Sequence, residues 1–276
     1  MLLKKKNKLG RAYKILFAIL TPIAILSLVV SISIFNYFNN KNDEIYNIAE
    51  IDLQNLDMDS DIYHYYKIGF KTIIGVDLSE HNKEVDFEEI KKQGVEFVIL
   101  RLGWRGYLNP EIHLDKYFEE YYQKAKDAGL NIGVYFFSQA INEEEAIEEA
   151  QFVIDNLSDK TIDLYVAYDY ESIDNDTART DDLTRHQATQ NAYAFLNTIS
   201  NAGYEPILYT NYNWIKYHYE FGILFDYPIW YAQYSKKPQY RGKYIIWQYA
   251  TSVPLNGISS NDGVDLNLMI IKEDIN

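Results

Sequence analysis

The chain has 276 residues, of which 47% are hydrophobic and 16% aromatic, and its formal net charge is −14. That length and composition support a folded core of one large domain or two modest ones. So acidic a surface repels phosphate backbones, which argues against nucleic acid as a partner, and the absence of cysteine excludes disulfide bonds and thiolate metal sites.

The N-terminus has the charge pattern of a membrane segment. Residues 1–14 carry basic side chains and no acidic one, and residues 15–36 are uncharged and largely apolar. Such a stretch can cross a bilayer as a helix, and the positive charge before it favours the cytoplasmic side. We predict a basic cytoplasmic segment (1–14), a transmembrane anchor (15–36) and an extracellular location for the rest. A cleaved signal peptide, and hence a secreted protein, is the alternative: there is no A-x-A-like site, but the small residues 31–33 leave cleavage open.

The next segment, residues 37–71, is polar, acidic and without clear periodicity, which predicts an extracellular stalk. From residue 72 the character changes, and apolar segments rich in β-branched and aromatic residues recur to the end of the chain. Such segments predict strands. There are eight of them: 73–79, 96–104, 131–140, 163–172, 205–211, 228–234, 244–250 and 263–270.

Helical patterns separate the first five predicted strands, and a weaker one follows at 214–222. The four clear patterns lie at 86–93, 111–128, 142–157 and 180–202. Three of them end in a glycine (Gly94, Gly129 and Gly203), and two begin with a capping residue (Asp86 and Asn142).

Strands that alternate with helices imply parallel βα units, while the last three predicted strands have only loops between them. We therefore predict an α/β fold: an irregular TIM-like barrel, (β/α)5β3, over residues 72–276, preceded by the N-terminal transmembrane helix. An open doubly wound sheet is the alternative.

Acidic residues gather where the predicted strands end. Asp77 ends the first strand, and Asp169 and Glu171 end the fourth, where their spacing puts both on one face. Asp265 lies in the last strand, which neighbours the first if the barrel closes. An acid at a strand end is often only a helix cap or turn residue, but four at one mouth predict an active site.

Clustered carboxylates either bind a hard cation or keep one acid protonated beside an ionised partner. Glycoside hydrolysis needs the second arrangement. Aromatic rings at or near strand ends favour a sugar substrate, since rings stack on pyranoses. The histidines form no zinc motif, and no serine nucleophile elbow or phosphate loop occurs, so we predict neither metal nor cofactor. The predicted substrate-binding residues are Trp104, Tyr135, Phe137, Tyr209, Trp230, Tyr234 and Trp247.

A set of motifs resembles the glycoside hydrolase family 25 lysozymes, the Chalaropsis-type N-acetylmuramidases. They are GVDLSEHN, YDYES, PILYTN, IWYAQY, IIWQYA and GVDLN, in that order, between about Ile74 and Met269. The resemblance implies a modified barrel of eight strands and five helices. It also implies cleavage of the β-1,4 bond between N-acetylmuramic acid and N-acetylglucosamine in peptidoglycan.

The resemblance also assigns roles to the acids. Glu171 corresponds to the general acid, Asp169 to the second carboxylate of the D-x-E pair, and Asp77 and Asp265 to the aspartates that flank the pocket. The chain departs from the family twice, with LRLGWRGY in place of a KATEG-like segment and Tyr-Phe-Phe (135–137) in place of Tyr-His-Phe. Neither departure touches the four carboxylates.

Together these observations predict a membrane-anchored peptidoglycan hydrolase for wall remodelling, with peptidoglycan glycan strands as partner and a monomeric catalytic domain. Glu171 is expected to be protonated at working pH, because Asp169 and aromatic burial raise its pKa. A retaining, an inverting and a substrate-assisted course all remain open. The alternatives are a non-catalytic wall-binding or scaffold protein on the same fold, and a glycosidase that acts on a chitin-like polymer.

Overall fold

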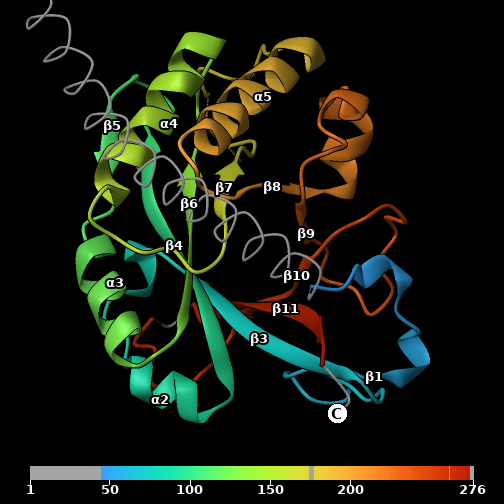
Figure 1. Ribbon diagram of the computed structural model, residues 1–276. Coiled ribbons are helices and arrows are strands. Elements are labelled where there is room, and N and C mark those ends of the chain that lie inside the picture. The colour runs from blue at the N-terminus through green and yellow to red at the C-terminus, as the bar shows by residue number, and fades with distance from the viewer. Residues whose placement is uncertain (1–44, 174–176, 261, 274–276) are drawn as a thin grey trace, which may run out of the picture. The chain divides into compact units, whose positions relative to one another are not determined.

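The computed structural model describes residues 45–173, 177–260 and 262–273, which form a closed eight-stranded barrel (Figure 1). The strands pair in the order β3-β11-β10-β9-β8-β7-β6-β4, and β4 closes the ring on β3. A short strand, β5 (Ile112–Leu114), is added to the outer edge of β4. All eight predicted strand positions are confirmed: β3 (Phe70–Leu78), β4 (Val95–Arg105), β6 (Asn131–Phe137), β7 (Val166–Asp169), β8 (Pro206–Asn211), β9 (Ile229–Ala232), β10 (Ile246–Val253) and β11 (Val264–Lys272).

The predicted fold class, a TIM-like (β/α)5β3 barrel, is wrong, because the last strand runs the other way. Strand β11 is antiparallel to both of its neighbours, β10 and β3, whereas the other barrel strands pair in parallel. A parallel return needs a crossover of a dozen or more residues, and the connection 254–263 has only ten. The chain therefore turns back directly, which sets Asp265 opposite Asp77 and Lys272 opposite Phe70.

The membrane part of the predicted fold receives no support from the structure. Residues 15–36 lie outside the described residues, and no helix within the described part of the chain is long and apolar enough to span a bilayer.

Four α-helices follow the first strands: α2 (Phe87–Lys92), α3 (Phe118–Asp127), α4 (Glu143–Leu157) and α5 (Arg185–Asn201). The predicted helix 111–128 begins later than expected because part of it forms β5, and the weak helix 214–222 is only a short π-helical turn at Trp214–His218. The predicted caps are present. Asp86 and Asn142 accept backbone N–H groups at the starts of α2 and α4, and three glycines with positive φ follow α2, α3 and α5.

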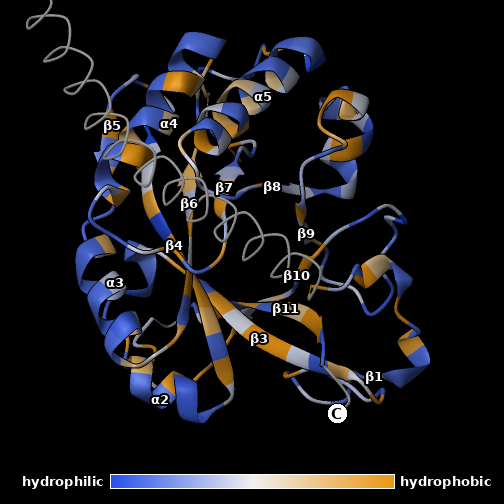
Figure 2. Ribbon diagram, viewed as in Figure 1, coloured by the Kyte–Doolittle hydropathy of each residue, from blue (hydrophilic) through white to orange (hydrophobic). Residues whose placement is uncertain are grey.

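The helices and the N-terminal segment cover different parts of the barrel wall. Helices pack on β4, β6, β7 and β8, while residues 46–66 cover the bare strands near β10 and β11 (Figure 1). In this segment, which belongs to the predicted stalk, Ile48, Leu56 and Tyr65 are buried in the core, and the Tyr46 N–H donates to the carbonyl of Ile270. The strands are largely apolar and the exposed helix faces hydrophilic (Figure 2), so the polar groups inside the barrel mouth are exceptions.

Candidate active site

The antiparallel closure brings the four predicted carboxylates to one end of the barrel. Asp77 lies near the C-terminal end of β3, and Asp265 lies opposite it, near the beginning of β11. Asp169 is the last residue of β7, and Glu171 follows two residues later. The charges of Asp77 and Glu171 both act on Asp169, so the acids form one electrostatic cluster.

Within the D-x-E pair, the surroundings of Asp169 favour its protonated form. Asp169 is 5% exposed, and burial, the charge of Glu171 and a hydrogen bond with Glu171 raise the pKa of Asp169 well above its usual range. Its Oδ1 is buried and makes no hydrogen bond to any residue that the structure describes. Glu171 is less buried than Asp169, so it is the member of the pair that faces the open mouth.

The second pair, Asp77 and Asp265, is held by amides and loop residues. Burial and the neighbouring charge of Asp265 raise the pKa of Asp77 to about 8, against the hydrogen bonds from Asn267 and Gln248. Asp265 Oδ1 accepts from the Thr251 hydroxyl at 2.7 Å and from the backbone N–H of Ser252 at 3.1 Å. Asp77 thus favours its protonated form at neutral pH.

Two amide side chains that were not predicted from the sequence hold Asp77 by hydrogen bonds. Gln248 and Asn267 both donate to Asp77 Oδ2, at 2.9 and 2.8 Å. Asn267 in turn accepts from the Trp230 indole N–H at 2.7 Å. Both amides are fully buried in strands β10 and β11, where an apolar side chain would be expected. The sequence did carry a sign of them, namely a polar residue at a strand position whose side chain points into the barrel.

Three of the predicted aromatic residues meet inside the barrel. The Trp230 ring lies 4.6 Å from that of Tyr209 and 6.1 Å from that of Tyr135, centroid to centroid. Trp230 and Tyr209 are buried, so they shape the floor of the site and do not present an open ring face. Tyr234 is 54% exposed and donates to Gln248 Oε1, which places it on the rim.

The remaining predicted aromatic residues separate into rim and outer wall. Trp104 and Phe137 lie half-buried at register positions near the ends of β4 and β6. Trp247 does not reach the site. It points to the outer face of β10, where it is fully buried, packs against Tyr63 and donates to the carbonyl of Gln233.

A positive charge that the sequence reading also missed borders the cluster. Arg101, on β4, donates to Asp115 at 2.8 Å, lies 3.3 Å from Glu80 and packs over the Trp104 ring. Its charge lowers the pKa of Asp169, opposing the larger effect of burial. Arg101 therefore favours the ionised form of Asp169, whereas burial favours the protonated form.

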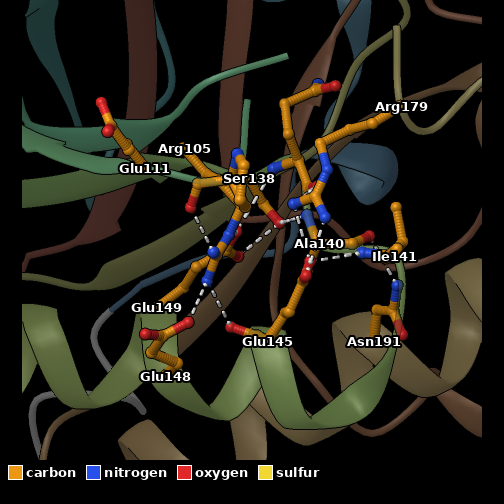
Figure 3. A network of polar contacts seen from close by, with 12 residues as sticks. Arg105, Glu111, Ser138, Ala140, Ile141, Glu145, Glu148, Glu149, Arg179 and Asn191 are labelled. Atoms are coloured by element: carbon orange, nitrogen blue, oxygen red, sulfur yellow. Dashed lines mark hydrogen bonds and ion pairs between the residues drawn. The ribbon is translucent and has the colours of Figure 1, made fainter. Parts of the chain in front are cut away.

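A buried network supports the loop that carries Glu171. The Gln139 side-chain amide donates to the Glu171 carbonyl at 3.3 Å. Behind it, Figure 3 shows Arg105 and Arg179 directed toward the acidic residues of α4. Arg105 pairs with fully buried Glu149 at 2.7 Å, and Arg179 pairs with Glu145, also at 2.7 Å. These ion pairs tie the end of β4 and the loop after β7 to α4.

The site has the donors of an acid–base centre. Within the described residues, no three histidine or acidic side chains are arranged as ligands of one metal ion. The cluster offers a carboxyl that favours its protonated form, that of Asp169, a more exposed acid beside it, and a buried Asp169 oxygen open to a hydrogen-bond donor.

The motifs and the barrel have known counterparts. The family described as Glycosyl hydrolases family 25 matches residues 76–258. The autolytic lysozyme of Clostridium acetobutylicum is 28% identical over 197 residues, which are 69% of this chain and 54% of that protein. The chain thus spans about half the length of this curated relative.

Two solved structures share the fold. The modular autolysin LytC of Streptococcus pneumoniae, in complex with a synthetic peptidoglycan ligand, has a TM-score of 0.65 at 19% identity, over 78% of this chain and 52% of that one. A family 25 glycosyl hydrolase of Bacillus anthracis has a TM-score of 0.59 at 22% identity, over 76% and 93%. Because the family match covers more than half of the chain, the protein belongs to glycosyl hydrolases family 25, which confirms the family and the enzyme class predicted from its motifs.

Proposed function

We propose that the barrel acts as a monomer and cleaves the β-1,4 bond between N-acetylmuramic acid and N-acetylglucosamine in peptidoglycan. One observation carries the proposal: buried Asp169, whose pKa is raised well above its usual range, lies beside the more exposed Glu171 in one electrostatic cluster with Asp77. The relatives support the substrate, since they include an autolytic lysozyme and an autolysin solved with a peptidoglycan ligand.

The reaction follows from the Asp169–Glu171 pair. Glu171, the more exposed member of its pair, gives a proton to the glycosidic oxygen as the bond from that oxygen to the sugar carbon breaks. Positive charge then develops on the sugar carbon, and the neighbouring carboxyl of Asp169 stabilises it. Water adds to this carbon and returns a proton to the Asp169–Glu171 pair, which completes the hydrolysis.

Digestion of purified peptidoglycan by the full chain tests this proposal. Glu171→Gln removes the proton donor, while Glu88→Gln makes the same change at an exposed position on α2 and serves as the control. Mass spectrometry of the products should show reducing N-acetylmuramic acid ends for the wild type and the control, and none for Glu171→Gln. NMR of the first product shows whether the configuration at the sugar carbon is retained.

Other products would contradict the proposal in recognisable ways. Reducing N-acetylglucosamine ends would identify a glucosaminidase, and cleavage of chitin oligomers alone would move the activity to a chitin-like polymer. Binding to peptidoglycan without release by any variant would indicate a scaffold protein. Full activity of Glu171→Gln would remove Glu171 from the mechanism.

A location at the outer side of the membrane also remains a proposal. It is supported by the charge-flanked apolar stretch 15–36 of the sequence and by the place of the proposed substrate, outside the membrane. Cell fractionation, with protease added to intact protoplasts, tests it. Digestion of the barrel in the membrane fraction is expected. A protected barrel would contradict the proposal, and a barrel found only in the medium would indicate signal cleavage.

A further inference from the structure

The side-chain amide of Gln248 uses all of its hydrogen-bonding capacity inside the barrel mouth. Its nitrogen donates to Asp77 Oδ2 at 2.9 Å and to Asp265 Oδ2 at 3.4 Å. Its oxygen accepts from the hydroxyls of Tyr209 at 2.8 Å and Tyr234 at 2.9 Å. An amide has two N–H hydrogens and two oxygen lone pairs, so these four contacts account for all of them.

The four partners fix the orientation of the amide. The Trp230 indole N–H fixes the Asn267 amide so that its nitrogen donates to Asp77 Oδ2, which makes this oxygen an acceptor. The Gln248 nitrogen therefore faces the same oxygen, and the Gln248 oxygen faces the hydroxyls. Gln248 is 2% exposed, so water does not compete for these positions. Each tyrosine donates its single O–H hydrogen to the amide oxygen. Toward anything else in the mouth, its oxygen is an acceptor.

We propose that Gln248 is a positioning residue of the reaction. Its two hydrogens hold the aspartate pair, and its oxygen turns both tyrosine hydroxyls into acceptors for N–H or O–H groups of the sugar. The proposal rests on the proposed function, because it names how the same site holds a glycan. The sugar groups that meet Tyr209 and Tyr234 are then donors, such as a ring hydroxyl or the acetamido N–H.

Asn267 provides a comparison within the same site. It also donates to Asp77 Oδ2, at 2.8 Å, but its oxygen accepts from the Trp230 indole. Asn267 therefore fixes one carboxylate against a buried ring, whereas Gln248 joins the aspartate pair to two hydroxyls at the substrate surface. Of the two amides, only Gln248 makes direct hydrogen bonds to both sides of the site among the described residues.

The charged and titratable groups around Gln248 come from five elements. Hydrogen bonds from Gln248 and Asn267 oppose the burial that raises the pKa of Asp77 to about 8. Loss of the Gln248 donor should therefore raise this pKa further. The groups are Asp77 on β3, Asp265 on β11, Tyr209 on β8, Tyr234 after β9, and Asp169 and Glu171 at the end of β7.

Two substitutions in the full chain separate positioning from simple space filling. Gln248→Met keeps the length of the side chain and removes every hydrogen bond, and Gln248→Glu keeps an acceptor toward the tyrosines but removes the donors toward the aspartates. Gln151→Met makes the matched change at an exposed position on α4. The readouts are kcat and KM on soluble glycan fragments of peptidoglycan across pH, and the titration of the Asp77 carboxyl by ¹³C NMR.

The expected results differ between variants. Gln248→Met should lower kcat by about 10- to 100-fold, the range for hydrogen bonds to charged groups, and should raise the titration midpoint of Asp77. Gln248→Glu should lose activity at neutral pH and regain part of it in acid, where the new carboxyl is protonated and donates again. Tyr234→Phe should raise KM and leave the pH profile of kcat in place. Gln151→Met should match the wild type.

Two outcomes would overturn the proposal. One is a Gln248→Met protein that is less stable but keeps the wild-type kcat profile, and the other is an unchanged Asp77 titration. A wild-type chain that releases no glycan fragments counts against the proposed function instead. The NMR titration then decides the role of Gln248 by itself.

Discussion

Replacing Asp77 with asparagine should stabilise the folded protein at neutral pH while it impairs catalysis. The pKa of Asp77 rises from an ordinary value of 3.8 to about 8 in the fold, chiefly through burial and then through the charge of Asp265. Between these two values the folded protein keeps the proton that the unfolded chain has lost. The free energy of unfolding therefore falls as pH rises through this window. Asparagine cannot ionise and escapes this loss.

The size of the effect follows from the two pKa values. Each pH unit inside the window is worth about 1.4 kcal/mol, so the difference between Asp77→Asn and the wild type should grow by about 4 kcal/mol from pH 4 to pH 7. Because the Asp77 residue is only partly buried, solvent screening reduces this, and we expect about 2–4 kcal/mol. Above pH 8 the difference should level off.

Urea unfolding of both proteins between pH 4 and pH 9 measures this difference, which includes the change that loss of the Asp77 charge makes to the titration of Asp169. Asp226→Asn removes the same charge from an exposed position and serves as the matched control for net charge. A stability difference that stays constant with pH, or one that shrinks from pH 4 to pH 7, would refute the reasoning. Glycan cleavage by Asp77→Asn should fall in parallel.

Three further predictions concern the barrel and its supports. Gly75→Ala should cost about 1–3 kcal/mol of unfolding free energy, because the added Cβ would lie 2.3 Å from Phe97; an unchanged urea midpoint would contradict the tight contact. Arg105→Met should cost about 3–5 kcal/mol, since it leaves Glu149 buried without its cation, and adding Glu149→Gln should restore most of the loss; a double variant no better than the single one would argue against the ion pair. Deleting residues 46–56 exposes apolar surface and removes buried side chains, so a drop in Tm is expected by calorimetry, and an unchanged Tm would show that this segment adds no stability.

The strands were predictable because each is an apolar run of the right length, but the direction of β11 was not. Side chains alternate with a period of two in parallel and antiparallel strands alike, so residues 264–272 look the same in either direction. The difference lies in the connection before the strand, where the stretch 254–263 lacks a helical pattern. That connection has only ten residues, fewer than the dozen or more that a parallel crossover needs, and this shortness was the sign of an antiparallel return.

The acids of the site were predictable from strand ends, and their supports were not. Asp169 and Glu171 stand out as charges at the end of an apolar strand, whereas Gln248 sits inside IIWQYA and resembles a tolerated polar residue. Whether Gln248 belongs to the site depends on which face of strand β10 its side chain occupies. A shift of one residue moves a side chain to the other face of the sheet, so Gln248 faces the acids while neighbouring Trp247 faces the N-terminal segment. The sequence pattern of a strand that is apolar on both faces does not show which face points into the barrel. That becomes clear only once the position of one of its side chains is known.

The antiparallel return of β11 also determines where the chain enters and leaves the barrel. Lys272 is paired with Phe70, and Tyr46 donates to Ile270, so both ends of residues 46–272 lie together at the pole opposite the acids. A circular permutant that joins these ends through a short linker and opens the chain elsewhere should keep the barrel intact. For the same reason, a fusion partner attached at either end would leave from the rear of the enzyme, and a long glycan strand would still have free access to the front.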